Sequence, residues 1–489
     1  MIIELERRIC PLSGFCLFLS FFFISLVIAQ EPYMVKDIWE GSSWGLDGLM
    51  DTIVIGDILY FPANDGIHGT ELWRSNGTAI GTWMVKDITP GSGDSNPRSF
   101  VEMNGIIYFW AEDDKHNGQF WKTNGTADGT TKIKDMRPSW LINVNGTLFF
   151  THSPTQLWKS NGTPEGTVMV IDIQPNVSNN IEYLINFHDK LYFNYTFYRF
   201  WKSDGTKEGT VEILNGGAND PVEYKNELYF GYRSSDMYAL ARSDGTTEGT
   251  VFLKTFHSAP QQLIRVRDTL FFMASTAEQG TELWKTDGTP EGTVLIKDIY
   301  PGSYYSYDAS YHNITKWNGN LYFTANDGTN GYELWKSDGT EQGTIMVKDI
   351  QPGWRDSSRP GSMIVINGII YFSAATYDYG RELWQSDGTE EGTHIVKDIN
   401  PGVSYAAPIS LTLSPKKLFF YADDGTHGEE LWAMDLLPAQ QITPQHIIDH
   451  ILNRKELPPE LLPYADKNDD GCVDIADVIL FAKMLDLYE

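Results

Sequence analysis

A nine-fold internal repeat constrains the fold of this chain more than any other feature. The stretch "GYELWKSDGTEQGTIMVKDIQPG" (331–353) recurs in varied spelling, each time with a Trp, an Asp-Gly-Thr type of turn and a Val-Lys-Asp-Ile type of run. Successive copies are 37 to 51 residues apart, a period typical of one four-stranded propeller blade. The repeat positions are Trp73, Trp121, Trp158, Trp201, Ala241 (the one replacement), Trp284, Trp335, Trp384 and Trp432.

Each repeat contains four strand signals in a fixed order. An apolar stretch such as "SFVEMNG" is followed by an aromatic run such as "LYF", then by "ELWKS" and then by "TIMVKDI". β-Branched and aromatic residues fill these runs, and Gly, Asn, Asp and Pro separate them. No helical period occurs before residue 440, so this part of the chain is expected to be all-β.

The two ends of the repeat region hold complementary parts of one repeat. The N-terminal "YMVKDIWEG" is a fourth strand without the first three, and "LFFYADDGTHGEELWAMD" stops after its third strand. A propeller that closes in this way removes two exposed sheet edges. We therefore expect residues 30–437 to form a β-propeller of about nine four-stranded blades, closed by the N-terminal strand. Two smaller rings are the alternative.

Charge and motifs restrict the classes of function. Lys and Arg number 37 against 65 Asp and Glu, a formal charge of −28, which opposes binding to nucleic acid or to an anionic membrane. The repeats contain no nucleophile elbow, phosphate loop or His-rich metal signature, and no catalytic residue is predicted. Pairs of carboxylates for glycoside hydrolysis remain an open alternative.

Residues 1–29 have the order of an export signal. Arg7 and Arg8 precede an apolar run over 15–28, and Val-Ile-Ala at 27–29 forms a small-residue cleavage site. The mature chain is therefore expected to be secreted, with no membrane span after cleavage. An uncleaved anchor over 11–29 is the alternative.

The repeated Trp and Asp have structural explanations. A Trp at the same strand position in eight copies indicates packing between neighbouring sheets rather than sugar stacking. The Asp of the Val-Lys-Asp-Ile run is replaced by Asn215 and Thr255 in two copies, and neither replacement can act as a general acid or base. We expect this Asp to accept hydrogen bonds from backbone N–H groups of the adjacent turn.

The Glu of the Glu-Leu-Trp motif occurs in only five copies, namely Glu71, Glu282, Glu333, Glu382 and Glu430. These copies also have the longer loop between the second and third strands. The pattern indicates that the Glu carboxylate serves this loop, either by bracing its backbone or by sharing a calcium ion with it. The candidate residues are Asn64, Asp65, Glu71, Asn326, Asp327 and Glu333.

The copies between about residues 119 and 256 have drifted from the repeat pattern. They lack the Glu and contain surplus aromatic residues, as in "YFNYTFYRFW" (192–201). A binding face in this arc is therefore a hypothesis.

Residues 438–489 change to a helical pattern around a predicted calcium loop. Carboxylate and amide side chains occupy loop positions one, three, five, nine and twelve, a Gly provides the bend at six, and a backbone carbonyl is available at seven. This spacing predicts an EF-hand-type site for Ca²⁺. Its ligands would be Asp466, Asn468, Asp470, Cys472 (through its carbonyl), Asp474 and Asp477.

Both parts resemble known families. The loop 466–477 with the following "VDIADVILFAKML" resembles the dockerin repeat of secreted polysaccharide-degrading complexes, although the preceding half, 443–457, lacks a second acidic loop. This resemblance implies calcium-dependent docking onto a cohesin-like or cell-surface protein. The repeats themselves resemble the ELWxxDGT repeat proteins, a group of secreted bacterial proteins, over about four hundred residues.

Three functions fit these patterns. The first is a secreted, non-catalytic propeller that binds carbohydrate or protein and is attached through the dockerin-like domain to a larger assembly. The second is a polysaccharide-active lyase or glycosidase. The third is an adhesin or surface-layer component.

Overall fold

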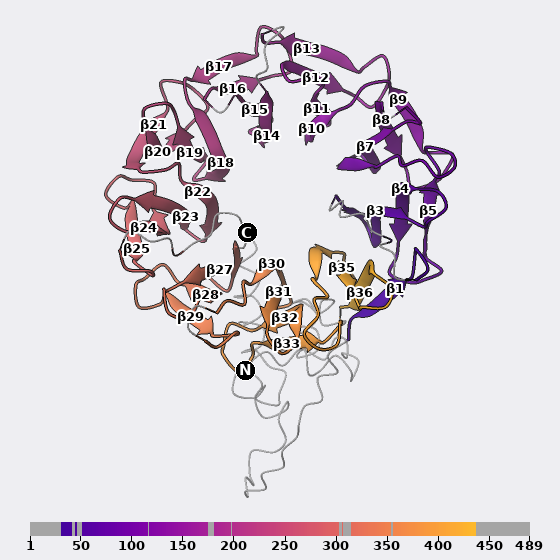
Figure 1. Cartoon of the computed structure of the whole chain (residues 1–489). Helices are drawn as coiled ribbons and strands as arrows, with labels where there is room; N and C mark the ends of the chain where they lie inside the picture. Colours follow the sequence, from indigo (N-terminus) through magenta and orange to yellow (C-terminus); the bar gives the residue numbers. More distant parts are fainter. Residues whose placement is uncertain are drawn as a thin grey trace, which may run out of the picture.

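The described part of the chain forms nine antiparallel sheets of four strands, arranged in one ring (Figure 1). The computed structural model describes residues 31–41, 45, 51–115, 117–174, 180–196, 198–302, 306, 314–353 and 356–436. The predicted signal segment 1–29 and the predicted calcium-binding domain 438–489 lie outside these residues. Within these residues the structure has no helix that is long and apolar enough to cross a membrane.

The strands of each blade follow one another in the chain, apart from the last blade. Blades one to three are β2 (Ile53–Ile55), β3 (Ile58–Asn64), β4 (Thr70–Ser75), β5 (Thr82–Lys86); β6 (Arg98–Met103), β7 (Ile106–Glu112), β8 (Gly118–Thr123), β9 (Thr131–Lys134); β10 (Ser139–Val144), β11 (Thr147–Thr151), β12 (Gln156–Ser160), β13 (Val168–Asp172). Blades four to six are β14 (Ile181–Phe187), β15 (Lys190–Tyr195), β16 (Phe200–Ser203), β17 (Val211–Leu214); β18 (Gly217–Tyr224), β19 (Glu227–Arg233), β20 (Tyr238–Ser243), β21 (Val251–Phe256); β22 (Gln261–Val266), β23 (Thr269–Thr276), β24 (Gly280–Thr286), β25 (Val294–Lys297). Blades seven to nine are β26 (Ile314–Trp317), β27 (Asn320–Asn326), β28 (Tyr332–Ser337), β29 (Ile345–Lys348); β30 (Gly361–Ile366), β31 (Ile369–Thr376), β32 (Gly380–Ser386), β33 (His394–Lys397); β34 (Ile409–Leu413), β35 (Lys417–Asp423), β36 (Glu429–Asp435), β1 (Tyr33–Lys36).

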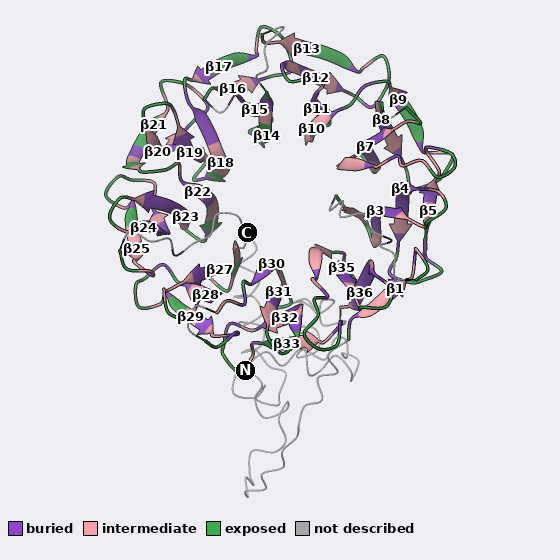
Figure 2. Cartoon of the chain, viewed as in Figure 1, coloured by how far each residue is buried: buried purple, intermediate pink, exposed green. Residues whose placement is uncertain are grey.

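The first strand of each blade lies toward the centre of the ring and the fourth strand lies at its rim (Figure 1). The second and third strands are buried along nearly their whole length, as in β3 and β4, because neighbouring blades cover both faces. The fourth strands are more exposed: in β13 and β21 the first two residues are exposed and the third is buried, and Figure 2 shows exposed segments in both strands. The aromatic runs in the sequence therefore mark the middle of each blade.

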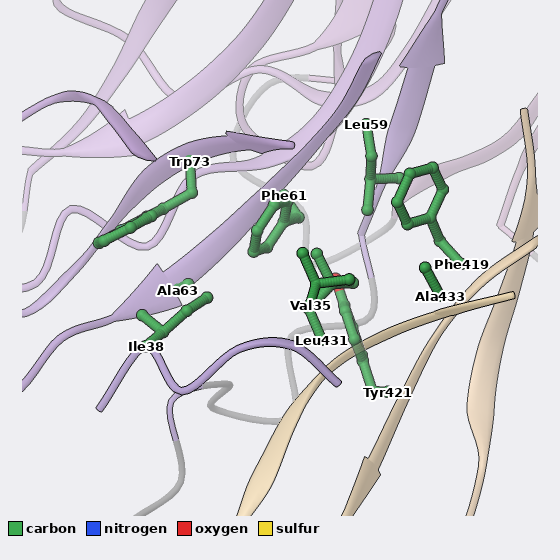
Figure 3. Close-up of a cluster of buried hydrophobic side chains, with 10 residues drawn as sticks. All are labelled: Val35, Ile38, Leu59, Phe61, Ala63, Trp73, Phe419, Tyr421, Leu431 and Ala433. Atoms are coloured by element: carbon green, nitrogen blue, oxygen red, sulfur yellow. The ribbon is translucent and has the colours of Figure 1, made fainter. Parts of the chain in front are cut away.

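The N-terminal strand closes the ring. Strand β1 pairs with β36, with Tyr33 opposite Ala433 and Met34 opposite Trp432. Val35 and Ile38 lie in a cluster of buried side chains from blades nine and one, which Figure 3 shows. The predicted closure by the N-terminal strand is thus confirmed.

The blades belong to a single ring rather than to two. Nine clusters of buried hydrophobic side chains each join two consecutive blades, and one of them joins blade nine to blade one. The clusters therefore follow one circuit through all nine sheets, and the alternative of two smaller rings does not hold.

The repeated Trp packs between blades, as predicted. Trp73 and Trp284 are each 5% exposed, and both lie in clusters that join neighbouring sheets. The repeated Lys of the fourth strand completes this contact, a role that the sequence pattern did not reveal. Lys297 of blade six donates to the backbone carbonyl of Thr344 in blade seven (2.8 Å), and its Nζ lies 5.8 Å from the centre of the Trp335 ring. The same pair of contacts is made by Lys36, Lys134 and Lys254.

The Asp-Gly-Thr segment is a self-bonded turn. In blade seven the carboxylate of Asp338 accepts hydrogen bonds from the backbone N–H (2.8 Å) and the hydroxyl (2.7 Å) of Thr340, and these bonds lower the pKa of Asp338. Gly339 has φ 88°, a conformation that favours glycine. This recurring motif therefore maintains the outer hairpin of the blade.

Candidate functional site

A β-bulge recurs near the start of the first strand of seven blades. At this point the pairing with the second strand shifts register, for example between Ser139 and Ile142 in β10. One residue of each bulge takes the left-handed conformation, with φ between 44° and 58°. These residues are Ser99, Trp140, Tyr183, Asp220, Gln262, Ser362 and Ser410.

Blades three and four carry aromatic residues at this position. Trp140 of β10 is 46% exposed and Tyr183 of β14 is 42% exposed, and their ring centres are 5.3 Å apart with planes inclined by 39°. We call these two residues the inner-rim pair. A bulky side chain at positive φ is unusual, and such strain often marks functional positions. Figure 1 shows β10 and β14 as neighbours on the inner side of the ring.

Polar residues occupy the bulge position on either side of the inner-rim pair. Ser99 stands there in blade two and Asp220 in blade five. The backbone N–H of Ser99 donates to the carboxylate of Asp51 in blade one, and that of Gln262 donates to Asp220, both at 2.7 Å. The inner-rim pair therefore consists of two exposed aromatic residues, and the blades on either side have polar residues at the same bulge position.

The binding-face hypothesis named different aromatic residues in the same arc. Most of the aromatics in "YFNYTFYRFW" are core residues: Tyr192, Phe193, Tyr195 and Phe200 are at most 3% exposed. Their number reflects packing between blades three, four and five. Aligning the first strands with one another would have found the inner-rim pair, because Ser362 and Ser410 occupy the same position in the regular blades eight and nine.

The Glu of the Glu-Leu-Trp motif is buried and braces a loop. The carboxylate of Glu71 accepts hydrogen bonds from the backbone N–H groups of Ile88 (2.9 Å) and Thr89 (3.1 Å) and from the hydroxyl of Ser95 (2.6 Å). Burial raises its pKa to about 7, although these three donors lower it. The braced loop follows the fourth strand, whereas the sequence pattern had linked this Glu to the loop between the second and third strands.

Glu333 makes equivalent contacts in blade seven. It accepts from the backbone N–H groups of Ile350 (3.0 Å) and Ser358 (2.9 Å) and from the Ser358 hydroxyl (2.5 Å). Burial raises the pKa of Glu333 to about 7. Ile350 and Ser358 lie far from Glu333 in the sequence. The repeat pattern therefore linked Glu333 to the loop between the second and third strands, which is nearer in the chain.

The predicted partners of these two Glu residues form hydrogen bonds within their own loops. Asn64 accepts from the Gly66 N–H, and Asp65 accepts from the N–H groups of Ile67 and His68. Asn326 and Asp327 repeat this arrangement in blade seven. Among the residues that the structure describes, no group of three or more His, Cys, Asp or Glu could hold a metal ion.

The six residues predicted to hold Ca²⁺ in the C-terminal domain lie outside the described residues. They are Asp466, Asn468, Asp470, Cys472, Asp474 and Asp477. Calcium binding there stays a prediction from the sequence.

Comparisons with known proteins add only distant likenesses of fold. No protein family and no curated protein sequence matches the chain. The computationally designed Ika8 protein is 11% identical, with a TM-score of 0.41 over 72% of this chain and 99% of its own. BamB from Moraxella catarrhalis is 10% identical (TM-score 0.38, covering 83% and 100%). A puromycin-hydrolyzing peptidase from Mycobacterium tuberculosis is also 10% identical (TM-score 0.35, covering 66% of this chain and 57% of its own). Likenesses this remote indicate nothing about function.

Proposed function

We propose that this protein is a secreted, non-catalytic recognition protein whose propeller binds carbohydrate through the inner-rim pair. The observation that carries the proposal is the exposed contact between Trp140 and Tyr183, held at strained bulge positions of two adjacent blades. The other recurring residues of the blades are occupied in packing, turns and loop bracing. Among the residues that the structure describes, the inner-rim pair belongs to none of these motifs.

The surroundings of the inner-rim pair favour a sugar over other ligands. Exposed aromatic faces offer apolar contact area at a small loss of conformational freedom. Ser99 and Asp220 on either side offer hydroxyl and carboxylate groups to hydroxyl-rich ligands. The formal charge of −28 opposes anionic ligands. Neutral glycans satisfy all three conditions.

The C-terminal domain would attach the propeller to a larger assembly. The support for this part is the spacing of Asp466, Asn468, Asp470, Asp474 and Asp477 around Gly471, together with the dockerin resemblance. The partner would be a cohesin-like or cell-surface protein bound in the presence of Ca²⁺. The propeller and the attachment domain would then act independently.

Binding to a glycan array tests the proposal. The full mature chain is expected to bind neutral glycans, and Trp140→Ala and Tyr183→Ala should each weaken binding about tenfold or more, since a stacked ring contributes on the order of 1 kcal/mol beyond its buried area. Tyr405→Ala is the matched control, because Tyr405 is an exposed aromatic residue (63%) in another part of the ring. Equal binding by all three variants would contradict the assignment of the inner-rim pair.

A chelator arm in the same experiment separates the two parts of the proposal. Removal of calcium should leave glycan binding unchanged and abolish capture of a cohesin-like protein. Loss of glycan binding on chelation would contradict the independence of the two parts.

A further inference from the structure

The closure of the ring contains two buried carboxylate oxygens that lack a hydrogen-bond donor. Glu430 on β36 is fully buried, and its Oε1 accepts from the backbone N–H of Trp39 (3.2 Å), just beyond β1. Its Oε2 has no partner in the described part of the chain, which sets it apart from the Glu of the other blades. Oδ1 of Asp37 has no partner there either, as is also true of the equivalent Asp87, Asp298, Asp349 and Asp398. Lys36 pairs with Leu431, so the antiparallel register places Asp37 opposite Glu430. Two acceptors therefore face the same dry interface from neighbouring strands.

Two other blades show how this cross-strand position is satisfied. Blades two and three have Gln in place of Glu, and the amide of each donates to the Asp of the fourth strand. Gln119 Nε2 lies 3.2 Å from Asp135 Oδ1, and Gln156 Nε2 lies 3.1 Å from Asp172 Oδ2. In these two blades a hydrogen bond therefore joins the side chain of the third strand to the Asp of the fourth strand. The Gln amide supplies the hydrogen for it.

Blade nine also lacks the serine donor that the Glu has in blades one, six and seven. Ser95 and Ser306 donate their hydroxyls to Oε2 of Glu71 and Glu282. In blade nine the equivalent loop position is Gly45. Its carbonyl accepts from the backbone N–H of Asn64, just as the carbonyl of Ser95 accepts from the backbone N–H of Glu112. Glycine has no hydroxyl, so Oε2 of Glu430 is left without this partner.

A proton fits this position better than a metal ion. Ca²⁺ requires six to eight oxygen ligands, and no group of three or more His, Cys, Asp or Glu among the described residues could hold a metal ion. The N–H of Trp39 directs its positive end at Glu430, which disfavours a cation beside it. His427, whose charge acts on Glu430, is already bonded to Asp424 (2.7 Å).

We propose that Glu430 keeps a proton and donates it in a hydrogen bond to Asp37, and that this proton is a pH-sensitive latch on the N-terminal closing strand. In the latched state the Glu430 hydroxyl donates to Asp37 Oδ1, as the Gln amides do in blades two and three. The proposal is independent of what the propeller binds.

The electrostatics agree with this geometry. The pKa of Glu430 is raised to about 8, chiefly by burial and also by the charge of Asp37, while the backbone N–H groups of Trp39 and Ile38 and the charge of His427 lower it. The folded-state pKa is therefore above the ordinary value of 4.5. The stabilisation from the proton is fully present below about pH 4.5 and is lost as the pH rises through about 8. Above that pH the buried negative charge of Glu430 is repelled by the charge of the half-buried Asp37 beside β1.

A pH series on Glu430→Gln tests the latch. The wild-type melting temperature is expected to fall between pH 5.5 and pH 9, and the fall should be at least about 2 °C smaller in Glu430→Gln, whose amide supplies a hydrogen at every pH. Gln119→Glu is the reciprocal variant and should steepen the fall, because it sets a new carboxylate against Asp113 and Asp135. Hydrogen exchange of Met34 and Val35 should accelerate above pH 8 in the wild type relative to Glu430→Gln.

Two outcomes would overturn the proposal. Equal pH dependence of wild type and Glu430→Gln would show that no proton is held at this position. A larger rise in melting temperature on addition of Ca²⁺ or Mg²⁺ in the full wild-type chain than in the full chain carrying Glu430→Gln would show that the pair holds a cation. If Glu430→Gln fails to fold, the reciprocal variant decides, since an unchanged pH dependence in Gln119→Glu would also refute the proposal.

Discussion

Deletion of residues 31–39 is expected to destabilise the propeller more than any point substitution. The deletion removes β1 and takes Val35 and Ile38, which are 4% and 5% exposed, out of the cluster between blades nine and one. Two buried aliphatic side chains together with the β1–β36 ladder contribute about 5 kcal/mol or more. The deletion also leaves β36 as an open edge. Urea unfolding and hydrogen exchange of β35 and β36 measure the effect.

The control for this deletion removes only residue 31. This change keeps β1 and the buried Pro32 and loses the exposed ion pair between Glu31 and Lys397. Such surface contacts contribute about 1 kcal/mol or less. If both deletions unfold at the same urea concentration, β1 does not carry the stability assigned to it.

Glu333→Ala is expected to lower the free energy of unfolding by about 3 kcal/mol or more. The substitution leaves two buried donors, the N–H groups of Ile350 and Ser358, without their acceptor, and each such group costs about 1–3 kcal/mol. Glu341→Ala in the same blade is the control, because Glu341 is exposed and its side chain braces no loop. Chemical denaturation at pH 6 measures both variants, and similar midpoints would contradict the bracing role.

The blades and their closure could be predicted because each repeat carries its own information. One copy of about forty residues contains the Trp, the Asp-Gly-Thr turn and the four strand signals. A prediction made from one copy can therefore be checked against the next. The split of the last blade between the two ends is also visible in the sequence, since the missing strand at one end is present at the other.

The contacts between blades were less accessible to sequence analysis. The partner of Lys297 is Thr344, which lies in the next blade, and nothing near Lys297 in the chain indicates it. The inner-rim pair depends on a register shift at which Trp140 and Tyr183 are exposed to solvent. The composition of the sequence indicated other aromatic residues of this arc, which are buried. The loop that Glu71 braces was also not identified from the sequence. Its donors, Ile88 and Thr89, come only after the next strand, β5.

The most direct test of the account is a disulfide between the two ends of the propeller. In a chain that starts at residue 31 and carries Cys472→Ser, the substitutions Tyr33→Cys and Ala433→Cys place two thiols on paired residues of β1 and β36. Oxidation is predicted to link them within one molecule and to raise its melting temperature, whereas Tyr33→Cys with Ala111→Cys, in blade two, should give no link. Failure of the 33–433 pair to form, or formation only between molecules, would contradict a single ring closed by its first strand.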